Sequence, residues 1–171
     1  MPILEIKLVP DPILRKKAAP LEKVSEDVKS ILNDMAETMY DAPGLGLAAN
    51  QVGILKRLVV IDCSKEEEDP NLIKMINPEI VYSSNERKEL EEGCLSIPDH
   101  KSIVKRPSKI IVKFLTIESK METLEAEGLL AACIQHEIDH LNGILFVDHI
   151  SRLKRDIILR KIKKQLRENE K

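Results

Sequence analysis

The chain has 171 residues, of which 43% are hydrophobic and 33% are charged, and its formal net charge is −2. This length and balance predict one soluble globular domain and give no sign of a general affinity for polyanions such as DNA. With two Tyr, two Phe and no Trp, the sequence also argues against a base-stacking surface for single-stranded nucleic acid.

Neither a membrane span nor a secretion signal is predicted. No run approaches the roughly 18 apolar residues of a span, and the first residues have neither a basic start nor a long apolar stretch. The three cysteines, Cys63, Cys94 and Cys133, cannot all pair with one another, so reduced thiols are expected. We therefore expect a cytoplasmic protein that does not associate with membranes.

The first half of the chain predicts a helix followed by strands. Ser25 is suited to cap a helix that reaches about residue 40, because apolar residues recur there at helical spacing. A small, apolar segment over 44–51 follows this helix. Short apolar and β-branched runs then predict strands within these ranges: 57–62, 72–81, 87–94 and 103–117.

The second half predicts two further helices. Pro98 and Pro107 are expected to break the strands near them. One helix is predicted over 126–141, and a last one, rich in Lys and Arg, from a cap at Ser151. This order predicts a single-domain α+β fold, with antiparallel strands around a central helix and further helices near each terminus.

The sharpest chemical signal is the segment His136-Glu-Ile-Asp-His140. Residues four apart on a helix share one face, so both imidazoles can bind the same cation. Glu137 projects beside them, where it can reach a water molecule on that cation. Two such histidines on an otherwise apolar helix favour a metal site over a pair of buried, hydrogen-bonded imidazoles.

A catalytic site of this kind needs a third protein ligand. In the pattern His-Glu-x-x-His-x-x-Gly-x-x-His it follows the second His by six residues, but that position is Phe146 here. The carboxylates further along the chain are poorly placed, so we expect the ligand upstream. Cys94, beside Gly93 at a predicted strand end, offers a thiolate, which is a strong ligand for zinc or iron. Cys63 and Cys133 are better explained as small core residues.

Three segments in this order resemble motifs of the peptide deformylase family: Gly44-Leu-Gly-Leu-Ala-Ala-Asn-Gln51, Glu92-Gly-Cys-Leu-Ser96 and Gln135-His-Glu-Ile-Asp-His140. The resemblance covers nearly the whole chain, and its terminal helix is similar to that of the Gram-negative bacterial form. It implies one catalytic domain over 1–171, in which a metal-binding helix packs against antiparallel strands. The activity it implies is removal of the N-terminal formyl group from N-formylmethionyl peptides of newly made proteins.

The resemblance also implies a metal and its ligands. Cys94, His136 and His140 resemble the family's ligands, with water in the fourth position. The metal implied is Fe(2+) in the cell, one per chain, which Zn(2+), Ni(2+) or Co(2+) can replace in preparations. Two imidazoles and a thiolate, taken alone, would suit zinc.

The remaining roles concern the reaction and the substrate. Glu137 resembles the general base and acid, while the side-chain amide of Gln51 and the backbone N–H of Leu95 resemble donors to the oxyanion. A methionine side chain needs an unbranched apolar pocket. The residues expected to line that pocket, or to lie along the peptide backbone, are Leu45, Gly46, Leu47, Leu129 and Cys133.

Partners and rival functions complete the expectations. Formylmethionyl nascent peptides are the expected substrate of a monomeric enzyme. The basic final helix is a candidate for ribosome contact, although a solvated helix face is the simpler explanation of its charge. A His-Glu-x-x-His metalloprotease is one alternative function. A non-catalytic metal-binding module is another, although a closed structural site normally has four protein ligands rather than three.

Overall fold

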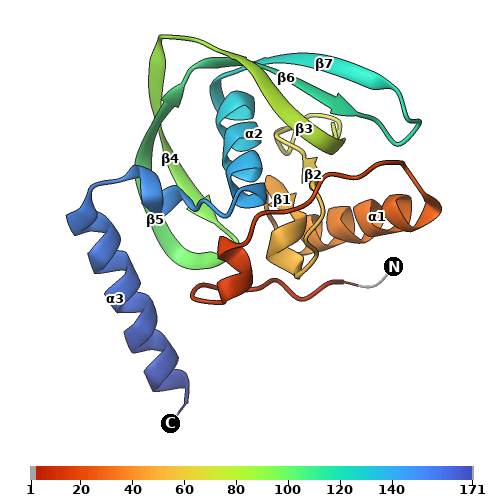
Figure 1. The fold of residues 1–171 in the computed structure, drawn as a ribbon. Coiled ribbons are helices and arrows are strands. Elements are labelled where there is room, and N and C mark those ends of the chain that lie inside the picture. The colour runs from red at the N-terminus through yellow and green to blue at the C-terminus, as the bar shows by residue number, and fades with distance from the viewer. Residues whose placement is uncertain (1–2, 171) are drawn as a thin grey trace.

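A computed structural model describes residues 3–170 and shows the predicted α+β fold (Figure 1). The helices and strands follow one another along the chain with these bounds: a 3-10 helix η1 (Pro12–Arg15), α1 (Glu26–Asp41), β1 (Gly46–Ala48), η2 (Ala49–Val52), β2 (Leu58–Ile61), β3 (Ile73–Ser83), β4 (Arg87–Cys94), β5 (Ile97–Pro107), β6 (Lys109–Leu115), β7 (Met121–Glu127), α2 (Gly128–Leu141), η3 (Phe146–His149) and α3 (Arg152–Asn169).

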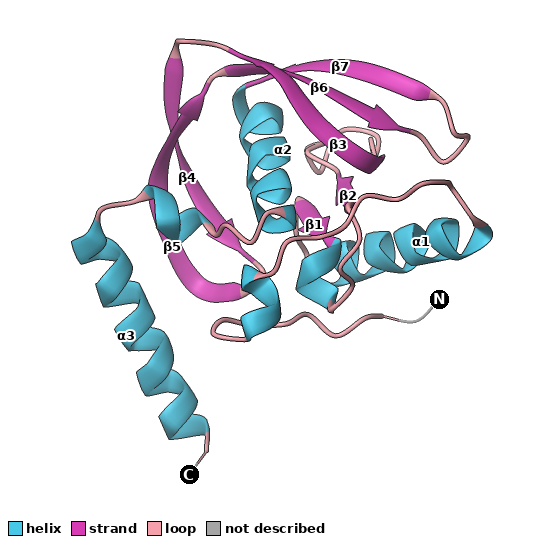
Figure 2. Cartoon of the chain, viewed as in Figure 1, coloured by secondary structure: helices cyan, strands magenta, loops and turns pink. Residues whose placement is uncertain are grey.

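Two antiparallel sheets surround α2. Strands β1-β2-β3-β6-β7 form a five-stranded sheet in that order, and β4 and β5 form a long two-stranded sheet. Figure 2 shows α2 between them, with β4 and β5 on one side and β1 and β2 on the other. Because α2 is apolar around most of its circumference, it is stable only when covered in this way.

Side chains of β2 alternate between two core clusters, one on each face of the sheet. Leu58 and Val60 pack against α1, whereas Val59 and Ile61 pack against α2. The alternation follows from the two-residue period of a strand, and it explains why this short strand is buried at every position. The strand therefore lies between the core cluster that contains α1 and the core cluster that contains α2.

Helices α1 and α3 begin at the predicted caps. The hydroxyl of Ser25 accepts a hydrogen bond from the amide of Val28, and the hydroxyl of Ser151 accepts one from the amide of Lys154. Helix α3 projects from the body of the molecule in Figure 1 and is attached through Ile158 and Ile162, which are buried. Within residues 3–170, no helix combines the length and the apolar character needed to cross a membrane.

The structure differs from the sequence prediction at three places in the second half of the chain. Strand β7 was not predicted, because its glutamate-rich sequence lacks a β-branched run, and α2 begins at Gly128 rather than near residue 126. Pairing with β6 holds these residues in a strand, and Gly128, with φ of +62°, turns the chain into the helix. Pro98 does not break β5. Ile97 pairs with Cys94 and Lys101 pairs with Gly93 of β4, so Pro98 lies in the bulge between these two pairs.

Candidate metal centre

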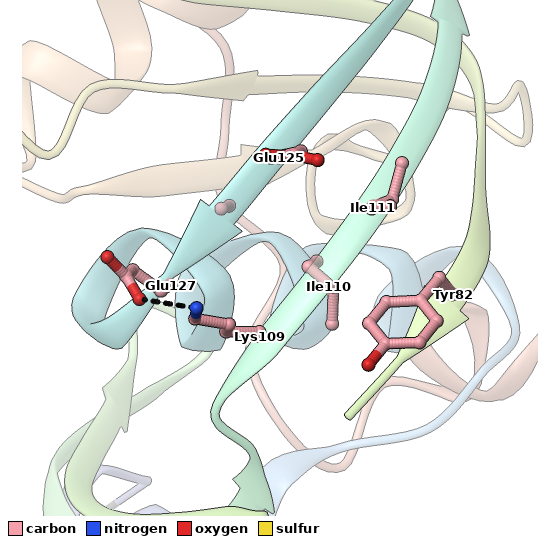
Figure 3. A pocket seen from close by; sticks show the side chains of 7 residues that line it. Tyr82, Lys109, Ile110, Ile111, Glu125 and Glu127 are labelled. Carbon is pink, nitrogen blue, oxygen red and sulfur yellow. Dashed lines mark ion pairs between the residues drawn. The ribbon is translucent and has the colours of Figure 1, made fainter. Parts of the chain in front are cut away.

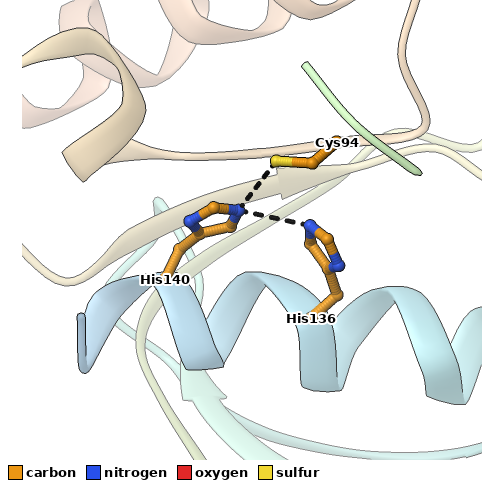
Figure 4. A group of neighbouring side chains, drawn as sticks. All are labelled: Cys94, His136 and His140. Atoms are coloured by element: carbon orange, nitrogen blue, oxygen red, sulfur yellow. Dashed lines mark hydrogen bonds between the residues drawn. The ribbon is translucent and has the colours of Figure 1, made fainter. Parts of the chain in front are cut away.

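Three ligand atoms from two elements meet beside α2 (Figure 4). The Nε2 atom of His140 lies 3.2 Å from the Sγ atom of Cys94 and 3.2 Å from the Nε2 atom of His136. The two histidines are one helical turn apart on α2, and Cys94 is the last residue of β4. Within residues 3–170, no other group of three His, Cys, Asp or Glu side chains could hold a metal ion in this way.

The geometry fits a metal ion shared by these three residues. All three ligand atoms lie within 4.8 Å of one another, so one ion at ordinary Zn–N and Zn–S distances of about 2.0–2.3 Å could contact them all. Burial lowers the pKa of His140 well below its ordinary value, which keeps the ring neutral as a ligand must be. The Nδ1 atom of His140 has no hydrogen-bond partner among the described residues.

A buried ion-pair network holds the other histidine. The Nδ1 atom of His136 donates to the carboxylate of Glu92 at 3.0 Å, and this bond turns the Nε2 atom toward the other two ligand atoms. The guanidinium of Arg106 binds the same carboxylate at 2.7 and 2.9 Å and reaches Asp139 at 2.9 Å. Burial alone would raise the pKa of Glu92, but the hydrogen bonds from His136 and Arg106 outweigh it and lower the pKa to about 2. Glu92 is therefore a carboxylate throughout the ordinary pH range.

Glu137 lies against the backbone of β1. A Cβ atom added to Gly46 would be 2.6 Å from the Oε2 atom of Glu137, so this carboxylate occupies the space that glycine leaves. Its Oε1 atom has no hydrogen-bond partner among the described residues. Burial raises the pKa of Glu137 to about 7, as expected for a carboxyl group withdrawn from water.

Both polar atoms of the Gln51 side-chain amide are hydrogen-bonded. Its Oε1 atom accepts a hydrogen bond from the amide of Ala48 at 3.0 Å. This contact turns the Nε2 group toward Ser96 at 3.1 Å and toward the sulfur of Cys94 at 3.6 Å. Leu95 lies in the short turn between β4 and β5, beside the same sulfur ligand. Both candidate oxyanion donors are thus next to the metal ligands.

A cavity of about 680 Å³ opens onto this centre. The side chain of Leu47 lies outside it, because it is fully buried under α1, so only the backbone of this residue could run along a bound peptide. The cavity is lined by the other candidate substrate residues and by the reactive groups: Leu45, Gly46, Gln51, Cys94, Leu95, Leu129, Cys133, His136 and Glu137.

A second, smaller pocket of about 280 Å³ lies away from the centre, on strands β3, β6 and β7 (Figure 3). Its polar wall is an exposed ion pair of 3.7 Å between Lys109 and Glu127. It holds neither histidine nor cysteine, so it offers none of the metal chemistry of the larger cavity.

The protease alternative has no support in this geometry. Phe146 stands where the extended protease pattern needs its third histidine, and its buried ring stacks on His136 with centroids 6.2 Å apart. The sequence analysis did not single out Glu92, Arg106 or Asp139 as functional residues. Glu92 and Asp139 lie within quoted motifs, but only the folded chain shows that Arg106 joins them.

Comparisons with known proteins all give relatives from one family. The family model described as polypeptide deformylase matches residues 3–156. A peptide deformylase of Rhizobium meliloti is 52% identical over 164 residues, covering 96% of this chain and 94% of the relative. The crystal structure of peptide deformylase from Ehrlichia chaffeensis has a TM-score of 0.94 and 40% identity, covering 99% of this chain and all of the other. A Met-Ala-Ser-bound peptide deformylase from Acinetobacter baumannii has a TM-score of 0.82 and 37% identity, covering 87% of this chain and 99% of the other.

Proposed function

Since the chain belongs to the peptide deformylase family, whose enzymes remove the formyl group from N-terminal methionine, we propose that its substrates are the N-formylmethionyl peptides of newly made proteins. One observation carries the proposal: the ligand atoms of Cys94, His136 and His140 converge at a cavity whose wall includes the buried Glu137. The Met-Ala-Ser-bound relative supports the same substrate class, because its peptide also begins with methionine.

Glu137 is the general base and general acid of the proposed reaction. It takes the proton of the water that attacks the formyl carbon, and it delivers that proton to the amine as the C–N bond breaks, releasing formate. A pKa raised to about 7 suits a group that must accept and then release a proton near neutral pH. Its unpartnered Oε1 atom provides the acceptor that this role needs.

Gln51 and Leu95 stabilise the negative charge that develops on the formyl oxygen. The Nε2 group of Gln51 is held beside Cys94 by the bond between its own Oε1 atom and the amide of Ala48, so it needs little reorganisation. The backbone N–H of Leu95 is the second proposed donor. Losing one such donor typically costs about 10²–10³ in rate.

The three ligands are proposed to hold one Fe(2+) ion per chain in the cell, with Zn(2+), Ni(2+) or Co(2+) able to replace it. A divalent metal, when bound, lowers the pKa of water toward about 7 and polarises the carbonyl group. The network of Glu92 and Arg106 would keep His136 in the tautomer that such an ion requires. Family resemblance supports iron, whereas the donor set itself also suits zinc.

The substrate is proposed to enter the cavity with methionine foremost. Leu129 and Cys133 on α2, together with Leu45, provide an apolar wall for the unbranched side chain. Strand β1 lies at the edge of its sheet, so one side of its backbone is available to pair with an extended peptide. Gly46 and Leu47 would form that pairing.

The first test is anaerobic hydrolysis of formyl-Met-Ala-Ser by the iron-loaded protein, with metal content measured in parallel. Wild-type turnover that is lost in Glu137→Ala, while the variant still holds one metal per chain, would support both the activity and the role of Glu137. The matched control is Glu122→Ala, an exposed glutamate on β7. Absence of turnover in fully loaded wild type would contradict the proposal and favour a metal-binding module.

Helix α3 is proposed to contact ribosomal RNA while the enzyme acts as a monomer. Its basic residues are mostly exposed and lie on an element that projects from the body (Figure 1). Reversing the charges of Lys161, Lys163 and Lys164 should weaken co-sedimentation with ribosomes, and unchanged co-sedimentation would contradict the contact. The matched control reverses three exposed lysines of the β6–β7 hairpin: Lys109, Lys113 and Lys120.

A further inference from the structure

A second cavity adjoins the large cavity at the metal centre and reaches the last turns of α3. This α3 pocket has a volume of about 270 Å³, and it shares three lining residues with the large cavity: Leu8, Pro98 and Asp99. Much of its remaining wall is formed by α3, through residues between Ile162 and Asn169. The two cavities therefore meet where the N-terminal segment lies beside the start of β5.

A peptide that pairs with β1 runs toward this junction. Its reactive end lies beside Glu137, which contacts Gly46. From Gly46 the large cavity follows the preceding residues 43–45, and beyond them its wall includes Ile6 and Leu8. An extended peptide that leaves the metal centre along this wall arrives at Leu8, where the α3 pocket begins.

The α3 pocket has an apolar lining that is partly open to water. Val9 and Ile162 belong to one core cluster and form its buried side. Leu8 and Leu166 also line it, and 46% and 38% of these residues are exposed. An apolar side chain placed in the pocket would remove part of this leucine surface from water, which is favourable.

We propose that the α3 pocket binds an apolar side chain of the substrate peptide, at a position beyond the third residue. The inference rests on the proposed function, because it gives the same formylmethionyl peptide a second point of contact. Antiparallel strands pair residue by residue, so a tripeptide that starts at Gly46 ends near Gly44 and does not reach the pocket. An acidic side chain is disfavoured there, because the two charged lining residues, Asp99 and Glu168, are both acidic.

A series of longer peptides tests this subsite in the iron-loaded protein under anaerobic conditions. The reference peptide is formyl-Met-Ala-Ser extended by serines, and a single leucine replaces serine in turn at positions four to eight. Leucine should raise kcat/KM about fivefold at one of these positions, because its side chain is partly buried in the pocket. Aspartate at the same position should give no increase.

Variants of α3 then locate the effect. In Leu166→Ser, the ratio of kcat/KM between the best leucine peptide and the all-serine peptide should fall close to one. The matched control is Leu153→Ser, an exposed leucine in the first turn of the same helix, which should keep the wild-type ratio. The leucine series on wild type needs no variant, so it tests the subsite even if a substitution loosens α3.

The possible failures are distinguishable. If wild type hydrolyses formyl-Met-Ala-Ser but leucine raises kcat/KM at none of the positions, the subsite is overturned and the proposed function stands. The subsite is also overturned if Leu153→Ser lowers the ratio as much as Leu166→Ser. Absence of turnover with every peptide would overturn the proposed function, and this inference with it.

Discussion

Gly46 and Glu137 approach so closely that no side chain fits between β1 and α2. A Cβ atom on Gly46 would lie 2.6 Å from Oε2 and 3.0 Å from Cδ of Glu137. The glycine is therefore required by the position of the carboxylate rather than by its own backbone conformation. The same contact places β1, an edge strand, beside the carboxylate of Glu137, which we propose transfers the proton in the reaction.

Replacing Gly46 with alanine should move Glu137 and slow turnover without loss of metal. The added methyl group must displace the carboxylate, and a shift of about 1 Å at a catalytic group can cost about 10²-fold in rate. The measurement is kcat/KM for a formylmethionyl peptide together with metal content. Thr123→Ala, at an exposed position of β7, is the control for a general effect of an alanine substitution in a strand. Equal activity of Gly46→Ala and wild type would contradict the contact.

Replacing Arg106 with methionine should destabilise the protein strongly. Glu92 is buried and would keep its charge after the guanidinium of Arg106 is lost. Breaking a buried ion pair by removing one partner typically costs about 3–5 kcal/mol. The measurement is the free energy of unfolding from denaturant titration. Arg87→Met, which removes an exposed arginine on β4, should change stability little.

The same variant should also bind metal more weakly, because Glu92 would orient His136 less firmly. Loss of such outer partners typically lowers metal affinity or activity by about 10–100-fold. A competition titration with a metal chelator would measure the change. An Arg106→Met protein that folds stably and binds metal as tightly as wild type would show that the network does not support the centre.

Metal removal should abolish activity and lower thermal stability together. The three ligands come from β4 and α2, so a bound ion stabilises their association only in the folded protein. At a free metal concentration 100 times Kd, this linkage amounts to about 2.7 kcal/mol. Thermal unfolding with and without chelator, followed by metal restoration, measures it. Cys94→Ser should show a much smaller shift, and a shift equal to that of wild type would argue against Cys94 as a ligand.

Tyr40 should make stability depend on pH in the alkaline range. Its hydroxyl donates a hydrogen bond of 2.6 Å to Asp62, although 46% of the residue is exposed. Partial desolvation, followed by this bond, raises the pKa of Tyr40 from 10.0 to about 12. Because the neutral form is favoured in the folded state, this contribution is fully present below pH 10 and is lost as the pH rises toward 12. The advantage of wild type over Tyr40→Phe in denaturant unfolding should therefore shrink over that interval. A constant difference would contradict the assignment.

The sequence predicted those features that depend on short-range backbone geometry. His136 and His140 are one helical turn apart wherever a helix forms, and Ser25 and Ser151 cap helices through bonds that span three residues. The cap positions and the α+β class are as predicted. The choice of Cys94 over Cys133 depended instead on excluding other positions, and the folded chain brings Cys94 to the two histidines.

Tertiary structure decided what depends on residues far apart in the chain. Strand β7 exists because β6 pairs with it, although its own sequence does not favour a strand. Arg106 reaches Glu92 across the β4–β5 hairpin and Asp139 on α2, and no local pattern predicts which carboxylates an arginine will bind. Local spacing is fixed by bond geometry within a few residues, whereas these contacts depend on how sheets and helices pack around one core.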